Sequence, residues 1–285
     1  MIDQASKLRA MVTNKKTTDS IKTYSIISGK GGVGKTNLAI NLGIKLQQMG
    51  KKVLILDADI GMSNANIMLG IDTPMDLLAV LQGKALLKDI VLKGPEDVDL
   101  ISGGANLFFM ENLDSKKQQE ILDSLSGLGD YDIIIIDNGA GISKQSLTFT
   151  TFAHEVILVT TPEPTALMDA YRVMKALSLY KLKDNIKVVV NQVQDLSQGE
   201  ETYNKLLQTA NKFLNLDIES LGFVFNDIRV GKAIMEQVPI VLRYPNALAS
   251  KNITEISRRI LGDKDYNNNV SSFQQLSNRL IRFFG

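Results

Sequence analysis

The chain has 285 residues, 44% of them hydrophobic, which is enough to bury the core of one large domain or two small ones. A formal net charge of +1 gives no general attraction to nucleic acid or to an anionic membrane, so such contacts would have to be local. The absence of cysteine excludes disulfides and any iron–sulfur or zinc site held by thiolates of this chain. The polar start and the lack of an apolar run of about 20 residues predict a cytoplasmic protein with no signal peptide and no membrane span.

The first 20 residues are predicted to form a segment of their own. In residues 1–12 apolar side chains recur every three to four positions, a pattern typical of a short amphipathic helix. The polar stretch TNKKTTDS follows and is expected to be a flexible linker. We therefore expect a terminal segment at 1–20 and a main domain at 21–262.

Short apolar runs alternate with longer helical stretches through the main domain. Runs that are apolar throughout are typical of strands buried on both faces, and helices between them imply right-handed crossovers between parallel strands. The pattern predicts one α/β domain with a mostly parallel central sheet flanked by helices. The expected strands are 24–28, 52–56, 98–102, 132–137, 155–160, 187–191 and 221–225.

A phosphate loop follows the first predicted strand. Residues 29–36 fit the pattern G-x-x-x-x-G-K-[ST], with a strand before them and a helix after them. Backbone N–H groups of such a loop converge on phosphate oxygens, Lys35 should neutralise the β- and γ-phosphates, and Thr36 should bind Mg²⁺. The general pattern gives no role to a second lysine, Lys30. The expected nucleotide-binding residues of the loop are Gly29, Lys30, Gly31, Gly32, Val33, Gly34, Lys35, Thr36 and Asn37.

Carboxylates end two more of the predicted strands. Asp137 ends the run DIIIID and is expected to hold Mg²⁺ through a water molecule. Asp57 and Asp59 follow the run KVLIL, where one of them could orient the attacking water. The alternative for this pair is that one carboxylate caps the next helix. The small residues at 138–141 suit a loop that moves when a γ-phosphate arrives.

Three motifs in this order resemble the ParA/MinD family of ATPases. Residues 30–36, KGGVGKT, match the deviant phosphate loop KGGxGK[ST] of that family. Residues 57–64 resemble its first switch and residues 137–141 its second, and the resemblance runs from about residue 24 to 261. It implies the fold of a phosphate-loop NTPase that uses ATP and Mg²⁺.

The resemblance also implies roles for single residues. Two subunits would close around two ATP molecules, with Lys30 reaching the phosphates of the partner and Asn64 lying near the partner subunit. Asp59 would position the hydrolytic water, so that Lys30, Lys35 and Asp59 form the catalytic set. Two further family positions, expected to bind the adenine base and to close over it, are Asn191 and Asp227.

The C-terminal segment, 263–285, begins with a linker containing three asparagines and continues with an amphipathic pattern flanked by arginines. Such a pattern suits an interfacial helix on anionic lipids, and the family often carries a C-terminal membrane-targeting helix. A helix packed on its own domain is the alternative. We expect peripheral attachment to the cytoplasmic face of the inner membrane through Phe273, Leu276, Leu280, Phe283 and Phe284.

The N-terminal segment resembles one branch of the family. Residues 3–9, DQASKLR, resemble the DQAxxLR motif of the FlhG (FleN or YlxH) branch, whose members control flagellar number and placement. Residues 137–143, DNGAGIS, are close to the DTGAGIS form of that branch, with Asn138 in place of the usual threonine. The resemblance implies that this helix stimulates the signal-recognition-type GTPase FlhF, with Gln4 entering its active site. The motif residues carried over are Asp3, Gln4, Leu8 and Arg9.

The sequence thus predicts a slow Mg²⁺-ATPase switch that dimerises with ATP and regulates flagellar biogenesis. Flagellar C-ring proteins or a flagellar transcription regulator are further expected partners. A division-site MinD protein is one alternative, although it would have no use for DQASKLR. A ligase-type metabolic enzyme of the same superfamily would need a second substrate pocket, for which no polar cluster is seen. DNA partitioning is the last alternative, and DNA binding is not expected because no segment is strongly basic.

Overall fold

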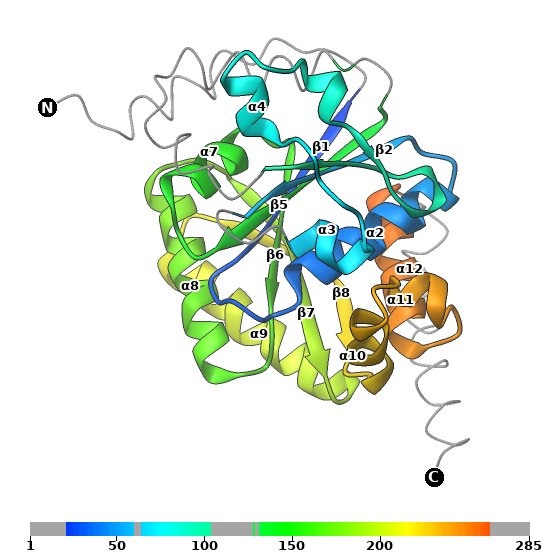
Figure 1. The fold of residues 1–285 in the computed structure, drawn as a ribbon. Coiled ribbons are helices and arrows are strands. Elements are labelled where there is room, and N and C mark those ends of the chain that lie inside the picture. The colour runs from blue at the N-terminus through cyan, green and yellow to red at the C-terminus, as the bar shows by residue number, and fades with distance from the viewer. Residues whose placement is uncertain (1–20, 60–63, 104–127, 129–130, 263–285) are drawn as a thin grey trace, which may run out of the picture.

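The computed structural model describes residues 21–59, 64–103, 128 and 131–262. Within these residues eight strands form one sheet in the order β3-β4-β2-β5-β1-β6-β7-β8 (Figure 1). All pairs are parallel except β3 with β4, so the prediction of a mostly parallel sheet is confirmed. The strands are β1 (Lys22–Ser28), β2 (Val53–Ala58), β3 (Leu92–Lys93), β4 (Asp99–Ser102), β5 (Ile133–Ala140), β6 (Glu155–Thr160), β7 (Asn185–Val193) and β8 (Asp217–Phe225).

All seven predicted strands are present, and the edge strand β3 was missed. It has only two residues, which is too short to produce a hydrophobic period, and it pairs antiparallel with β4. Its position depends on a turn at Pro95–Asp97, where Glu96 and Asp97 both have positive φ angles. One strand, β4, separates this edge from β2, which carries Asp57 of the predicted site.

Helices cover both faces of the sheet. The α2 and α12 helices pack on one face, while α8 and α9 pack on the other (Figure 1). Alternate side chains of one strand serve the two layers, so Ile26 of β1 contacts the first layer and Ile27 the second. The helices are α2 (Lys35–Gln48), α3 (Asn64–Leu69), α4 (Leu77–Leu81), α7 (Lys144–Phe152), α8 (Pro164–Leu179), α9 (Leu196–Phe213), α10 (Ile228–Met235), α11 (Ile240–Arg243) and α12 (Leu248–Ile260).

The strand order brings the predicted motifs to one edge. The β1 strand lies between β5 and β6, and β5 pairs in turn with β2. In the β2–β5 register Asp57 lies opposite Asp137. Because the carboxyl ends of parallel strands share one edge, the phosphate loop after β1 meets the ends of β2, β5 and β7 there.

The two predicted terminal segments, 1–20 and 263–285, lie outside the described residues. The partner motif at 3–9 and the five expected lipid-contacting residues therefore remain sequence predictions. Among the helices that are described, none is both long and apolar enough to cross a membrane.

Candidate nucleotide site

The phosphate loop joins β1 to α2 and is held tightly against the rest of the domain. A Cβ on Gly29 would lie 2.2 Å from the backbone carbonyl group of Asp169 in α8, so only glycine fits there. Gly34, at the N-cap of α2, has a φ of 87° and no side chain that could occupy the first N–H groups of the helix. The start of α2 can therefore donate these N–H groups to phosphate oxygens.

A buried ion pair lies at the end of the loop. The Lys35 Nζ is 3.1 Å from Asp137 Oδ1, with side chains that are 7% and 0% exposed. Burial raises the pKa of Asp137, and Lys35 and the nearby Thr36 hydroxyl oppose that rise. The other oxygen, Asp137 Oδ2, is buried without a hydrogen-bond partner. An oxygen of this kind, next to Thr36, suits Mg²⁺ or one of its water ligands, so the predicted metal residues do come together.

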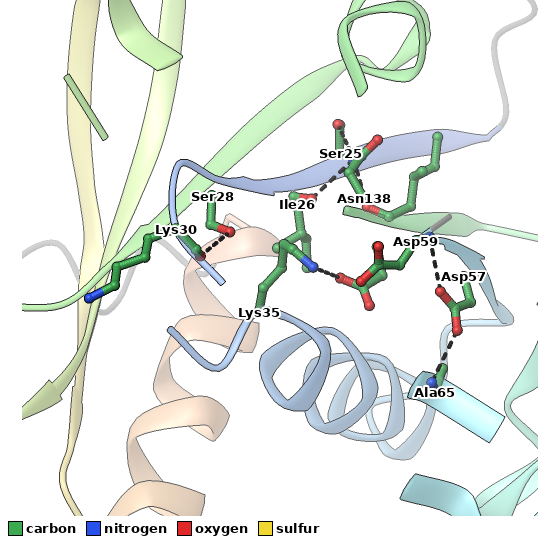
Figure 2. A network of polar contacts seen from close by, with 11 residues as sticks. Ser25, Ile26, Ser28, Lys30, Lys35, Asp57, Asp59, Ala65 and Asn138 are labelled. Atoms are coloured by element: carbon green, nitrogen blue, oxygen red, sulfur yellow. Dashed lines mark hydrogen bonds and ion pairs between the residues drawn. The ribbon is translucent and has the colours of Figure 1, made fainter. Parts of the chain in front are cut away.

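Asp57 links the two ends of the first switch. Its carboxylate accepts hydrogen bonds from the backbone N–H of Asp59 at 3.1 Å and of Ala65, in the first turn of α3, at 3.0 Å (Figure 2). The side chain is only 1% exposed. The capping alternative left open by the sequence therefore holds for Asp57.

Asp59 lies across from the second switch. A Cβ on Gly139 would be 2.8 Å from Asp59 Oδ1, so the carboxylate rests directly on that glycine. The other carboxylate, Asp57, accepts a hydrogen bond from the first turn of α3. Its position against the second switch makes Asp59 the candidate for orienting the attacking water.

The pKa of Asp57 makes the stability of the nucleotide-free protein depend on pH. Burial, and then the charge of Asp137, raise this pKa from 3.8 to about 7. Between these pH values the folded chain keeps the proton that the unfolded chain has lost. We expect stability to fall as pH rises from about 4 to 7, by about 1.4 kcal/mol for each unit by which the two pKa values differ.

Chemical denaturation without nucleotide or metal at pH 5 to 8 measures this slope. Asp57→Asn should reduce the slope, while Asp137, whose pKa burial also raises, should preserve part of it. The matched control is Asp217→Asn at the exposed start of β8, which should keep the full slope. Equal slopes in the Asp57 variant and the control would contradict the assignment.

Lys30 occupies a different place from Lys35. Its Nζ is 2.6 Å from Glu163 Oε1 and 2.8 Å from Thr165 Oγ1, at the start of α8. Figure 2 shows the Lys30 and Lys35 side chains pointing in different directions from the loop. The hydrogen bond from Lys30 lowers the pKa of Glu163. Sequence reasoning missed Glu163, although an acid just beyond the carboxyl end of β6 would have been the signal.

Asn138, the departure from the family motif, is buried between β5 and β1. Its Nδ2 donates to Ser25 Oγ at 2.9 Å and to the Ile26 carbonyl at 3.0 Å (Figure 2). These bonds tie the end of β5 to the strand that precedes the phosphate loop. The side chain therefore has a supporting role next to Asp137.

The two residues expected near the base, Asn191 and Asp227, differ in their contacts with the described residues, because only Asn191 has a hydrogen bond to the phosphate loop. Asn191, near the end of β7, donates from Nδ2 to the Val33 carbonyl at 2.7 Å, which brings it to the phosphate loop. Asp227 caps α10, and its two oxygens bind the Arg229 guanidinium at 2.8 and 2.7 Å. Asn64 is the first residue of α3, but its side chain lies outside the described part of the structure.

Comparison with known proteins agrees with this geometry. Residues 20–261 match the ParA family model, which is described as NUBPL iron-transfer P-loop NTPase. The chain belongs to the ParA family of P-loop NTPases. The iron chemistry in the family description would need ligands other than thiolates in these 285 residues, because they contain no cysteine.

Two flagellar proteins are among the relatives of this chain. The flagellum site-determining protein YlxH of Helicobacter pylori is 32% identical over 265 residues, which cover 90% of each chain. The antiactivator FleN of Pseudomonas aeruginosa is 29% identical over 241 residues, 84% of this chain and 86% of FleN. These relatives confirm the resemblance to the FlhG branch.

A solved structure supports the cofactors. The septum site-determining protein MinD of Pyrococcus horikoshii, complexed with Mg-ADP, is 28% identical with a TM-score of 0.69, covering 84% of this chain and 96% of that one. Together with the loop, the Lys35–Asp137 pair and the orphan Asp137 oxygen, this shows that the protein is a P-loop ATPase that uses ATP and Mg²⁺.

Proposed function

We propose that the protein is an ATP-dependent dimerising switch that regulates flagellar number and placement. The observation that carries the switch is the position of Lys30, which is held by Glu163 of its own subunit and does not share the site of Lys35. Because the Lys30 ammonium group lies outside the nucleotide site of its own subunit, it can bind the phosphates of a second subunit once Glu163 releases it. In this proposal ATP closes the dimer, and hydrolysis returns it to monomers.

Dimer closure would have to release Lys30 from its own subunit. The Lys30–Glu163 pair is partly exposed, with side-chain exposures of 34% and 55%, so it opposes closure only weakly. ATP supplies the phosphate charge that competes with Glu163 for the ammonium group. The pair therefore acts as a modest restraint on the monomer.

Lys30→Ala should abolish ATP-dependent dimerisation and leave nucleotide binding largely intact, because Lys35 and the loop backbone remain.

Glu163→Gln removes the charge that competes with the phosphates for Lys30. It should favour the dimer by at most about fivefold, as expected for an exposed pair. Light scattering against ATP concentration measures both effects. Lys175→Ala, on the exposed side of α8, is the matched control and should dimerise normally. A normal dimer in the Lys30 variant would remove this role.

The flagellar assignment rests on the relatives and on the N-terminal motif. One relative carries the name of a flagellum site-determining protein and another that of an antiactivator. The DQASKLR motif supports a helix that acts on an FlhF-type GTPase. The amphipathic C-terminal pattern supports attachment to anionic lipids, and flagellar C-ring proteins or a transcription regulator complete the proposed set of partners.

Two truncations of the full chain test both terminal roles and control each other. Deleting residues 1–20 should abolish stimulation of GTP hydrolysis by the cognate FlhF-type GTPase and preserve ATP-dependent sedimentation with anionic vesicles. Deleting residues 263–285 should do the reverse. Unchanged GTPase stimulation in the first variant would contradict the proposed action of residues 1–20 on the GTPase. Unchanged sedimentation in the second would place the membrane contact elsewhere.

Division-site selection is the second candidate, favoured by the similarity to solved MinD structures. A protein of that kind would also bind membrane with ATP. It would have no effect on the GTPase, so the first truncation separates the two candidates.

A further inference from the structure

Two neighbouring side chains near the end of β7 hold two neighbouring carbonyls of the phosphate loop. Asn191 Nδ2 donates to the Val33 carbonyl at 2.7 Å, and Gln192 Nε2 donates to the Gly32 carbonyl at 3.4 Å. Sequence reasoning assigned Asn191 to the base and gave Gln192 no role.

Consecutive side chains of a regular strand point to opposite faces, so this arrangement needs a local distortion. Gln192 has a φ of +58°, in the left-handed region that residues other than glycine seldom adopt. The register with β8 passes from Asn191 opposite Val224 to Val193 opposite Phe225, which leaves Gln192 as the extra residue of a bulge. Asn191 Oδ1 accepts the Gln192 backbone N–H at 2.9 Å and stabilises this turn. Bulges of this kind redirect a side chain near a functional site.

Gly34 leaves room for the Asn191 amide. A Cβ on Gly34 would lie 2.3 Å from Asn191 Nδ2, so a side chain there would push the amide away from the Val33 carbonyl. Gly34 therefore satisfies two requirements, its φ of 87° and the close approach of Asn191.

Holding the carbonyls also orients the N–H groups. In a trans peptide the C=O of one residue and the N–H of the next point in opposite directions. When the Gly32 and Val33 carbonyls are bound toward β7, the N–H groups of Val33 and Gly34 face away from β7. Donors that are oriented before the ligand arrives bind it with less ordering cost.

We propose that Gln192, acting with Asn191, is a positioning residue for phosphate binding. The bulge at the end of β7 holds the phosphate loop in the conformation that presents its N–H groups to the phosphates of ATP. The strained backbone of Gln192 is retained because it turns the second amide toward the loop.

Gln192→Ala in the full chain tests this proposal, with fluorescent mant-ADP titration as the main measurement. We expect affinity to fall about three- to tenfold, as expected for the loss of one modest hydrogen bond and of the loop conformation that it holds. Gln192→Lys keeps an N–H donor and should recover most of the affinity. Gln194→Ala, two residues further along and exposed, is the matched control and should bind as the unaltered chain does.

Two further measurements separate positioning from a base contact and from a structural role. Displacement of mant-ADP by inorganic tripolyphosphate should weaken as much as displacement by ADP, because the proposed effect lies in the phosphate loop. Hydrogen exchange at residues 29–36 of the nucleotide-free Gln192→Ala variant should accelerate. Gln192→Gly, which relieves the positive φ, should keep or raise the melting temperature and still bind weakly. Unchanged affinity in the Ala and Gly variants, or a loss seen with ADP but not with tripolyphosphate, would overturn the proposal.

Discussion

Replacing Lys35 with alanine should lower kcat/KM for ATP by about 10²–10³-fold, because this buried ammonium group is a preorganised positive charge in the phosphate site. The same change should destabilise the nucleotide-free protein by up to about 3–5 kcal/mol, because it leaves Asp137 buried without its charge partner. Steady-state ATPase assays and urea unfolding measure the two effects separately.

A double-mutant cycle tells the two effects apart. Lys35→Ala/Asp137→Asn removes the uncompensated charge and should recover most of the lost stability, while ATP binding stays impaired. Lys45→Ala is a matched control on the same helix, where the ammonium group contacts Gln48. If the double variant recovered activity together with stability, Lys35 would have a structural role and would not be needed to bind the phosphates.

Asp59→Ala should lower ATP turnover by about 10²–10³-fold and leave ATP affinity nearly unchanged, because the water would lose the carboxylate that orients it. The ATP-bound dimer should consequently persist, and it can be followed by light scattering during single-turnover hydrolysis. Asp59→Asn should also be slow, because the neutral amide keeps only one acceptor oxygen with which to orient the water. Turnover close to normal in either variant would exclude this role.

Asp57 offers a contrasting variant for the same assay. Its carboxylate caps α3 and holds the Asp59 backbone, so Asp57→Asn keeps one acceptor oxygen for two N–H donors. We expect a smaller loss of turnover than in the Asp59 variants. A larger loss would reverse the roles given to the two carboxylates.

Much of the fold and of the phosphate site could be predicted because those signals are local. Apolar runs identified seven of the eight described strands, and the short β3 escaped because two residues carry no period. The glycine spacing before Lys35 predicted the loop and the start of α2. Asp137 was predicted from its position at the end of a buried strand.

The remaining assignments depend on individual contacts that the sequence pattern does not specify. Asp57 and Asp59 are equivalent by alternation, and the hydrogen bond from the Ala65 N–H identifies Asp57 as a cap of α3. The partner of Lys30 is Glu163, 133 residues further along the chain, just beyond the end of the neighbouring strand β6. The sequence marks Glu163 as an acid beyond the end of a strand, but it does not show which lysine that acid binds.

The sequence by itself determined the fold class, the phosphate loop and the family resemblance, because hydrophobic period and glycine spacing are properties of short segments. The tertiary structure decided what each polar side chain does, because hydrogen bonds depend on distances set by packing. It separated Lys30 from Lys35 and Asp57 from Asp59. The tertiary structure also brings Gln192 to the phosphate loop through a bulge in β7, which the residue types at this position do not predict.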